Sequence, residues 1–135
     1  MAGAGHYNRA VLGELIIRAE GDSSSGFQKC RVRLTPARHH LNASGRIHGG
    51  VTLGLIDVSL FAAMHLLRGM PLAKSVTIDI QTQFIGPGTA AKPLDAVVEV
   101  LRETRRMGFL RGLVVQEDDL VASFTGTLRK PAKAI

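Results

Sequence analysis

The feature that most constrains the fold of this chain is its longest apolar stretch, Val51–Leu67, which carries only a few polar residues, among them Asp57, Ser59 and His65. The run is too long for a strand and lacks alternation, so it predicts a helix over Gly50–Leu67, ended by the Gly69-Met70-Pro71 sequence. It is slightly short for a membrane span, and Asp57 in its middle would be costly in hydrocarbon. We therefore interpret it as a buried core helix, which the rest of the chain has to cover on nearly every side.

Six segments with strand character flank the helix, two before it and four after it. The expected strands are Leu12–Ala19, Phe27–Leu34, Ser75–Ile85, Leu94–Glu103, Phe109–Gln116 and Leu120–Leu128. The first two are separated by a Gly, Asp and Ser cluster that is typical of a hairpin turn. The sequence thus predicts a single α+β domain over residues 1–135, with a curved antiparallel sheet wrapped round one central helix. Residues 1–8 and 130–135 are expected to fray.

Composition narrows the function classes. The net charge of +6 suits an anionic partner, but it does not choose between nucleic acid, membrane and polyphosphate. The absence of Trp and the single Tyr argue against a reader of single-stranded nucleic acid, and no recognition helix is evident, so we expect no nucleic-acid partner. The single Cys30 excludes an intrachain disulfide and a cysteine-rich metal site. No secretion signal is evident in the first residues, so we expect a cytoplasmic protein. We also expect no metal.

The chemistry-bearing residues gather where a loop enters the helix. The loop Asn42–Gly50 ends in His48-Gly49-Gly50, and Asp57 follows inside the helix, giving the motif N-x2-G-x2-H-G-G-x6-D. The two glycines place unobstructed N–H groups at a helix N-terminus, where negative charge is favoured. Such a site can bind an anion or stabilise the oxyanion formed when a thioester carbonyl is attacked. Asp57 is the carboxylate that could attack the carbonyl or activate water.

This loop, the helix and the strands after it resemble the hotdog-fold thioesterases, specifically the phenylacetyl-CoA thioesterase-like family, over roughly Leu12–Lys130. The resemblance implies a hotdog fold with five to six strands. It also implies hydrolysis of an aryl- or medium-chain acyl-CoA to free acid and CoA, without a cofactor. Hotdog dimers pair their sheets side by side and often form tetramers, so a homo-oligomer, dimer or tetramer, is expected.

The same resemblance assigns catalytic roles to five residues. Asp57 would be the nucleophile or general base, and the Gly49 N–H would polarise the carbonyl. Asn42 would supply a side-chain amide at the reacting centre, with His48 orienting it. Ser75, eighteen residues after Asp57, matches a serine that helps to hold the attacking water in some members.

Substrate binding is assigned to Gly50 and to a basic turn where such enzymes often bind the CoA tail, Arg105, Arg106, Met107 and Gly108. The apolar residues expected to line an acyl pocket are Leu53, Leu60, Phe61, Met64 and Phe84. Cys30 is expected to pack in the core. His39 and His40 would point apart in an extended chain, so a shared metal is not expected.

Two other functions remain open from the residues. One is a hotdog-fold hydratase or dehydratase acting on acyl thioesters, although its catalytic histidine normally has a different loop context. The other is a non-catalytic acyl-CoA-binding module, although such regulators usually carry a DNA-binding segment. The thioesterase interpretation is favoured over both, and free-thiol release from CoA thioesters would separate them.

Helix geometry adds a prediction about assembly. Gly49 and Asp57 are separated by about 12 Å along the helix axis. A carbonyl held by the Gly49 N–H must lie about 3 Å from its nucleophile, or one water away from its base. One helix cannot meet both conditions, whereas a second, antiparallel copy related by a two-fold axis can. The sequence therefore predicts that each active site is shared between two chains.

Overall fold

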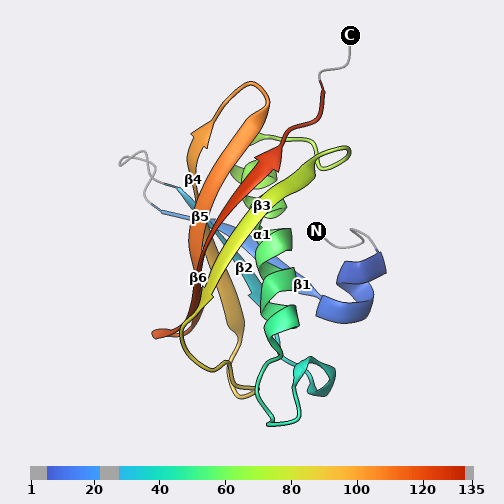
Figure 1. Ribbon diagram of the computed structural model, residues 1–135, viewed down its shortest axis with the longest axis vertical. Helices are drawn as coiled ribbons and strands as arrows, with labels where there is room; N and C mark the ends of the chain where they lie inside the picture. The colour runs from blue at the N-terminus through green and yellow to red at the C-terminus, as the bar shows by residue number, and fades with distance from the viewer. Residues whose placement is uncertain (1–5, 22–27, 133–135) are drawn as a thin grey trace.

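The computed structural model describes residues 6–21 and 28–132 of the chain. The elements in chain order are β1 (Leu15–Glu20), β2 (Lys29–Leu34), α1 (Gly49–Arg68), β3 (Val76–Phe84), β4 (Leu94–Glu103), β5 (Met107–Gln116) and β6 (Asp119–Arg129). Two short helical turns, η1 (Asn8–Leu12) and η3 (Arg38–His40), precede β1 and α1. The predicted order of two strands, one long helix and four strands is confirmed (Figure 1).

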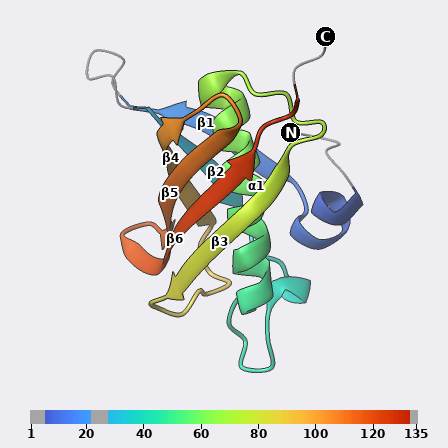
Figure 2. The same cartoon turned by 45° about the horizontal axis from the view of Figure 1, so that its top comes forward.

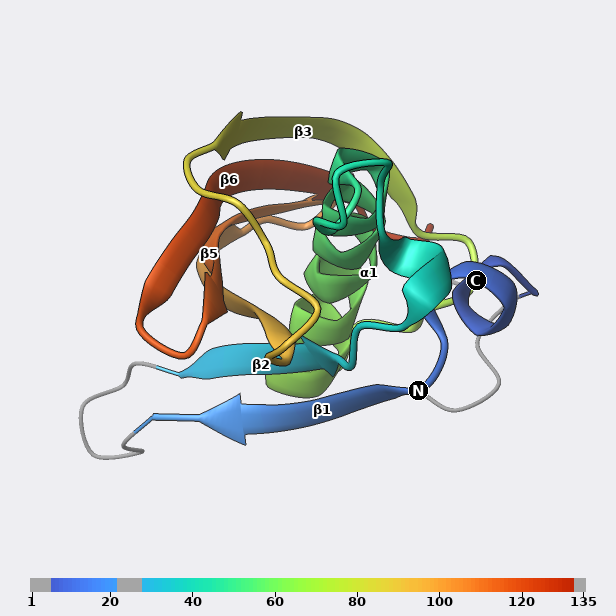
Figure 3. The ribbon, with the colours of Figure 1, turned by 90° about the horizontal axis from the view of Figure 1, so that it is seen from below.

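The six strands form one antiparallel sheet in the order β1-β2-β4-β5-β6-β3. The chain leaves β2, passes through α1, and crosses to the far edge of the sheet to form β3, which pairs with β6. The sheet curves round α1, as the view along the helix shows (Figure 3). The predicted α+β architecture is therefore confirmed, with six strands.

The core lies between α1 and the concave face of the sheet. Alternate residues of the central strands point at the helix and are fully buried, namely Cys30, Val32, Leu34, Leu94, Ala96 and Val98. Helix and sheet approach closely at Gly126, where an added Cβ would come within 2.4 Å of the Leu60 side chain. α1 is long and apolar enough to cross a membrane by length and composition, and it lies inside the curve of the sheet. The predicted buried core helix is confirmed.

The first strand is shorter than predicted. Leu12 belongs to η1 and is only 1% exposed, so its side chain joins the core from a helical turn. The backbone then turns at Gly13, with a φ of 82°, before β1 begins at Leu15. The helical turn starts at His6, within the stretch expected to fray. The predicted hairpin turn falls mostly on residues 22–27, which lie outside the described residues.

Candidate active site

α1 begins at Gly49, with His48 as its N-terminal cap. The N–H of Gly50 donates to Nδ1 of His48 at 2.9 Å, so a neutral His48 carries its proton on Nε2. The N–H of Gly49 has no acceptor among the described residues, because the first helical position has no intrahelical partner. The sequence predicted two available amides here. The structure leaves the amide of Gly49 free and uses that of Gly50 in the cap.

Asn42 opens a tight loop ahead of α1. Its Oδ1 accepts the N–H groups of Ser44 at 2.9 Å and Arg46 at 3.1 Å. These two donors fix the orientation of the side-chain amide, because only its oxygen can accept. The Nδ2 amine has no acceptor among the described residues, so it is the part of Asn42 that is available to a substrate.

Asp57 lies half-buried in the third turn of α1 and is held by a hydroxyl from β3. Thr77 donates its hydroxyl to Oδ1 of Asp57 at 2.6 Å, the short distance typical of a hydrogen bond to an ionised carboxylate. Ser75, which the family resemblance matched to a serine that helps to hold the attacking water, donates to the carbonyl of Leu72 at 2.7 Å. Thr77 is therefore a site residue that the sequence analysis missed. The available signal was its position two residues after Ser75, on the same side of the strand.

Gly49 and Asp57 do not meet within one chain. They stand about 12 Å apart along α1, and the hydrogen bond from Thr77 turns Asp57 toward β3 at the sheet edge. Figure 2 shows β3 running along this edge beside α1. The structure thus places the free amide and the carboxylate on one helix at a separation that a single thioester carbonyl cannot span.

The basic turn lies at the opposite end of α1 from Gly49. Arg105 and Arg106 are exposed between β4 and β5. Glu103, just before them, lies 3.8 Å from Arg68 in the last turn of α1, which is about 28 Å from Gly49 along the axis. Within one chain the turn is therefore remote from the free amide.

The other two residues of the basic turn face the protein. Met107 is half-buried, and its N–H donates to the Thr104 hydroxyl at 3.0 Å. Gly108 is buried, and an added Cβ would lie 2.9 Å from the sulfur of Met64. Gly108 is therefore a packing position rather than a surface one.

The predicted pocket residues divide into two groups. Leu60 and Met64 are fully buried against the sheet, so they belong to the core. Leu53 and Phe84 are exposed and Phe61 is half-buried. Phe84 contacts the start of α1, since its ring lies 3.6 Å from the position that a Cβ on Gly49 would take. These last three side chains are apolar and at least partly exposed.

Other candidate residues serve the scaffold. His39 and His40 do not point apart. In η3 their rings lie with centroids 4.0 Å apart and their planes tilted by 45°, and each ring approaches the carbonyl of Val11. The His40 carbonyl accepts the N–H of His48 at 2.8 Å, which ties this loop to the start of α1. Burial raises the pKa of the Cys30 thiol to about 11, as expected of a packing residue.

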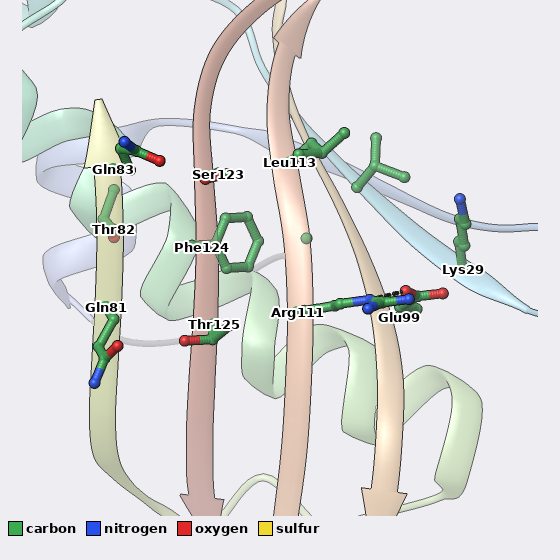
Figure 4. Close-up of a pocket in the computed structure, with 12 residues that line it drawn as sticks. Lys29, Gln81, Thr82, Gln83, Glu99, Arg111, Leu113, Ser123, Phe124 and Thr125 are labelled. Carbon is green, nitrogen blue, oxygen red and sulfur yellow. Dashed lines mark hydrogen bonds and ion pairs between the residues drawn. The ribbon is translucent and has the colours of Figure 1, made fainter. Parts of the chain in front are cut away.

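A hollow of about 640 Å³ lies on the outer face of the sheet, away from α1 (Figure 4). It is lined by Lys29, Gln81, Thr82, Gln83, Val97, Glu99, Arg111, Gly112, Leu113, Ser123, Phe124 and Thr125. Arg111 and Glu99 form an ion pair within it. Within one chain, none of the motif residues borders this hollow.

Comparison with known proteins places the fold and the motif in one class. The family of acyl-CoA thioesterase N-terminal domains matches residues 37–129. A Pseudomonas aeruginosa protein that is named as an esterase is 32% identical over 100 residues, and the match covers 74% of this chain and 74% of that protein. Human acyl-coenzyme A thioesterase 13 is 26% identical over 100 residues, covering 73% of this chain and 66% of the human protein.

Solved structures agree on the fold. A conserved protein of Pseudomonas aeruginosa is 29% identical, with a TM-score of 0.74, and the match covers 94% of each chain. Zebrafish thioesterase superfamily member 2 has a TM-score of 0.77 at 21% identity, over 96% of this chain and 89% of that chain. The E. coli PaaI protein of the phenylacetic acid degradation operon has a TM-score of 0.76 at 23% identity, over 94% of this chain and 86% of that chain.

The fold and the motif thus define a hotdog-fold protein of the thioesterase superfamily, similar to the PaaI proteins. Within that superfamily, the chain belongs to the acyl-CoA thioesterase family.

Proposed function

We propose that this protein is an acyl-CoA thioesterase that hydrolyses an aryl- or medium-chain acyl-CoA, at a site built by two copies of the chain. The observation that carries the proposal is the arrangement on α1. The free Gly49 amide and the Asp57 carboxylate are suited to one reaction, yet lie about 12 Å apart on the same helix. A two-fold partner would bring Asp57 of the partner subunit opposite Gly49.

The free edge of β3 supports this pairing. Among the described strands, β3 pairs on one side only, with β6. Val76 and Ile78 on this edge strand are 48% and 54% exposed, and an exposed apolar edge is a template for another strand. Antiparallel pairing of β3 with its copy would be symmetric, and it would set the two α1 helices side by side.

The reaction then uses groups from both subunits. The thioester carbonyl oxygen accepts the Gly49 N–H, which stabilises the negative charge that develops there. Asp57 of the partner subunit either takes a proton from a water that attacks the carbonyl carbon, or attacks it directly and forms an anhydride that water later hydrolyses. In both routes the C–S bond breaks and the products are the free acid and CoA. Thr77 holds Oδ1 of its own Asp57, which leaves Oδ2 for the reaction.

The same pairing brings a basic turn toward the site. Arg68 follows Asp57 by eleven residues, so in the proposed dimer the partner's Arg68 is offset from Gly49 by about 16 Å along the helix axis, instead of about 28 Å within one chain. Arg105 and Arg106 stand level with that end of α1. We infer that the turn of the partner meets the CoA phosphates.

Free-thiol release from a panel of acyl- and aryl-CoA thioesters tests the activity, with a thiol-reactive dye as the readout. At least one substrate should be turned over, and Asp57→Asn should lower kcat by about 100-fold or more, because it keeps the size of the side chain and removes its charge. The melting temperature of the variant controls for folding. A folded variant that keeps more than about a tenth of the parent's kcat would remove Asp57 from the mechanism.

A further inference from the structure

The N-terminal helical turn η1 is anchored against the loop that leads into α1. The carbonyl of Val11 is approached by Nε2 of His40 at 2.6 Å and by Nε2 of His39 at 3.0 Å. The next residue, Leu12, is 1% exposed and sits in the core. Residues just before this anchor are therefore held in place against α1, beside which η1 lies in Figures 1 and 3.

Tyr7 directly precedes η1, and its side chain lies over Gly54 of α1, where the helix has no side chain. Its hydroxyl oxygen is 2.5 Å, and its Cζ 3.4 Å, from the position that a Cβ on Gly54 would occupy. Only glycine at position 54 allows the phenol to lie this close to the helix. The ring is nevertheless 51% exposed, so half of its surface remains open beside α1.

Gly54 lies on the side of α1 that carries Asp57. It precedes Asp57 by three residues, a spacing that keeps the two on one helix face, and it follows the cap residue Gly50 by four. Gly49 itself is five residues from Gly54, so the two lie on different sides of α1. If Gly49 faces Asp57 of the partner subunit, the two-fold axis passes between the two α1 helices, level with the midpoint of these positions, next to Gly54 along the helix. Along the helix, Tyr7 is then level with that axis, between the levels of the two proposed active sites.

We infer that Tyr7 blocks the path of an acyl group along α1 and so limits its length, an inference that rests on the proposed function. Gly54 lies about 7.5 Å from Gly49 along α1. An extended chain advances about 1.2 Å per bond, so an acyl chain running inward along α1 meets the phenol after about six bonds. Aryl groups and short chains fit in this length, and longer chains collide with the ring. The inference narrows the proposed substrates to compact acyl groups.

The test compares kcat/KM for a saturated series from acetyl-CoA to dodecanoyl-CoA, together with phenylacetyl-CoA. Tyr7→Ala should raise the ratio of decanoyl-CoA to butanoyl-CoA turnover by about 10-fold or more, the scale of steric discrimination in apolar pockets. Tyr7→Phe keeps the ring and should keep the parent's profile, and Tyr7→Leu should fall between. Ile16→Ala truncates another exposed apolar side chain, on β1, and should leave the profile unchanged.

Melting temperatures show whether each variant is folded. If Tyr7→Ala is not folded, Tyr7→Leu replaces it in the comparison. An active parent whose chain-length profile is the same in the folded Tyr7 variants overturns this inference alone. A parent that hydrolyses no thioester in the series overturns the proposed function and this inference with it.

Discussion

At the scale of single residues, the orientation of Asp57 depends on one hydroxyl. Thr77 donates to Oδ1, whereas Ser75 donates to the carbonyl of Leu72 and stabilises the turn before β3. The hydrogen bond from Thr77 has a charged acceptor, so its loss should cost more than the loss of a neutral one, about 1.5–3 kcal/mol. The carboxylate would then be free to rotate away from the position that the reaction needs.

We therefore expect Thr77→Val, which keeps the shape of the side chain, to lower kcat by about 10-fold while KM changes little. Ser75→Ala should lower kcat less. Steady-state kinetics of the two variants with the same acyl-CoA decide between the hydroxyls. A larger loss in Ser75→Ala would mean that the serine, as the family resemblance implies, holds the attacking water.

The sequence could predict the residues that belong to backbone motifs but not which side chains meet. The start of α1 follows from local chain geometry, and the structure places His48, Gly49 and Gly50 at that start. Ser75 and Thr77 share one face in the strand that the sequence predicts, but in the structure β3 begins only at Val76, so Ser75 belongs to the preceding turn and Thr77 reaches Asp57. Tyr7 lies in a segment expected to fray, and its position depends on the distant His39 and His40.

At the scale of elements, a buried carboxylate links the first three strands of the sheet. Asp95 of β4 is 2% exposed and accepts hydrogen bonds from Arg33 at 2.8 Å and Arg31 at 2.7 Å, both on β2. Arg31 also bonds Glu20 of β1 at 2.6 Å. Burial of Asp95 opposes its ionisation, but the hydrogen bonds from Arg33 and Arg31 outweigh that effect and hold its pKa below the ordinary value of 3.8.

Asp95→Asn should therefore destabilise the protein at pH 7, because it leaves two arginines without their buried partner. Since these arginines are partly exposed, we expect a loss of about 2 kcal/mol, below the usual cost of breaking a fully buried pair. A folded-state pKa below 3.8 stabilises the fold above that pH, and the benefit is lost as the pH falls through the folded-state pKa. The difference between parent and variant should thus shrink below about pH 4.

Urea unfolding at several pH values measures this difference. Asp119→Asn is the matched control, because Asp119 makes an exposed ion pair with Lys92 at 3.5 Å and should contribute little. Equal unfolding free energies for the parent and Asp95→Asn at pH 7 would contradict a stabilising role for the network. The sequence did not indicate this network, because it joins Arg31 and Arg33 to a carboxylate more than sixty residues away through strand register.

At the scale of the whole molecule, the fold was the most predictable property. Few folds of a 135-residue chain can bury a long apolar helix that lacks a polar face. A single curved sheet wrapped round the helix is one of them. The crossing of β3 to the far edge does not follow from periodicity, because alternation specifies faces and not neighbours. Among the described strands, that crossing leaves one edge of β3 unpaired beside α1, which supports the proposed shared site.

The shared site makes a quantitative prediction about mixed dimers. Gly49→Pro should remove the proposed oxyanion donor and keep the helix, because proline suits the first helical position and has no N–H. The preceding residue, His48, has a φ of −63° and a ψ of 136°, which proline permits in the residue before it. A Cβ at position 49 would make only an ordinary contact with Phe84, at 3.6 Å. Gly49→Pro and Asp57→Ala should each be nearly inactive alone.

In a mixed dimer of these two variants, one active site contains both substitutions and the other active site contains neither. Random assembly makes about half of the dimers mixed, so about a quarter of the parent's sites should return under two-fold symmetry. Co-expression followed by thiol-release assays measures the recovery, native mass spectrometry counts the mixed dimers, and each variant expressed alone gives the background. Mixed dimers that are present but no more active than that background would mean that Gly49 and Asp57 serve within one chain, so the helix separation would have to be bridged in another way.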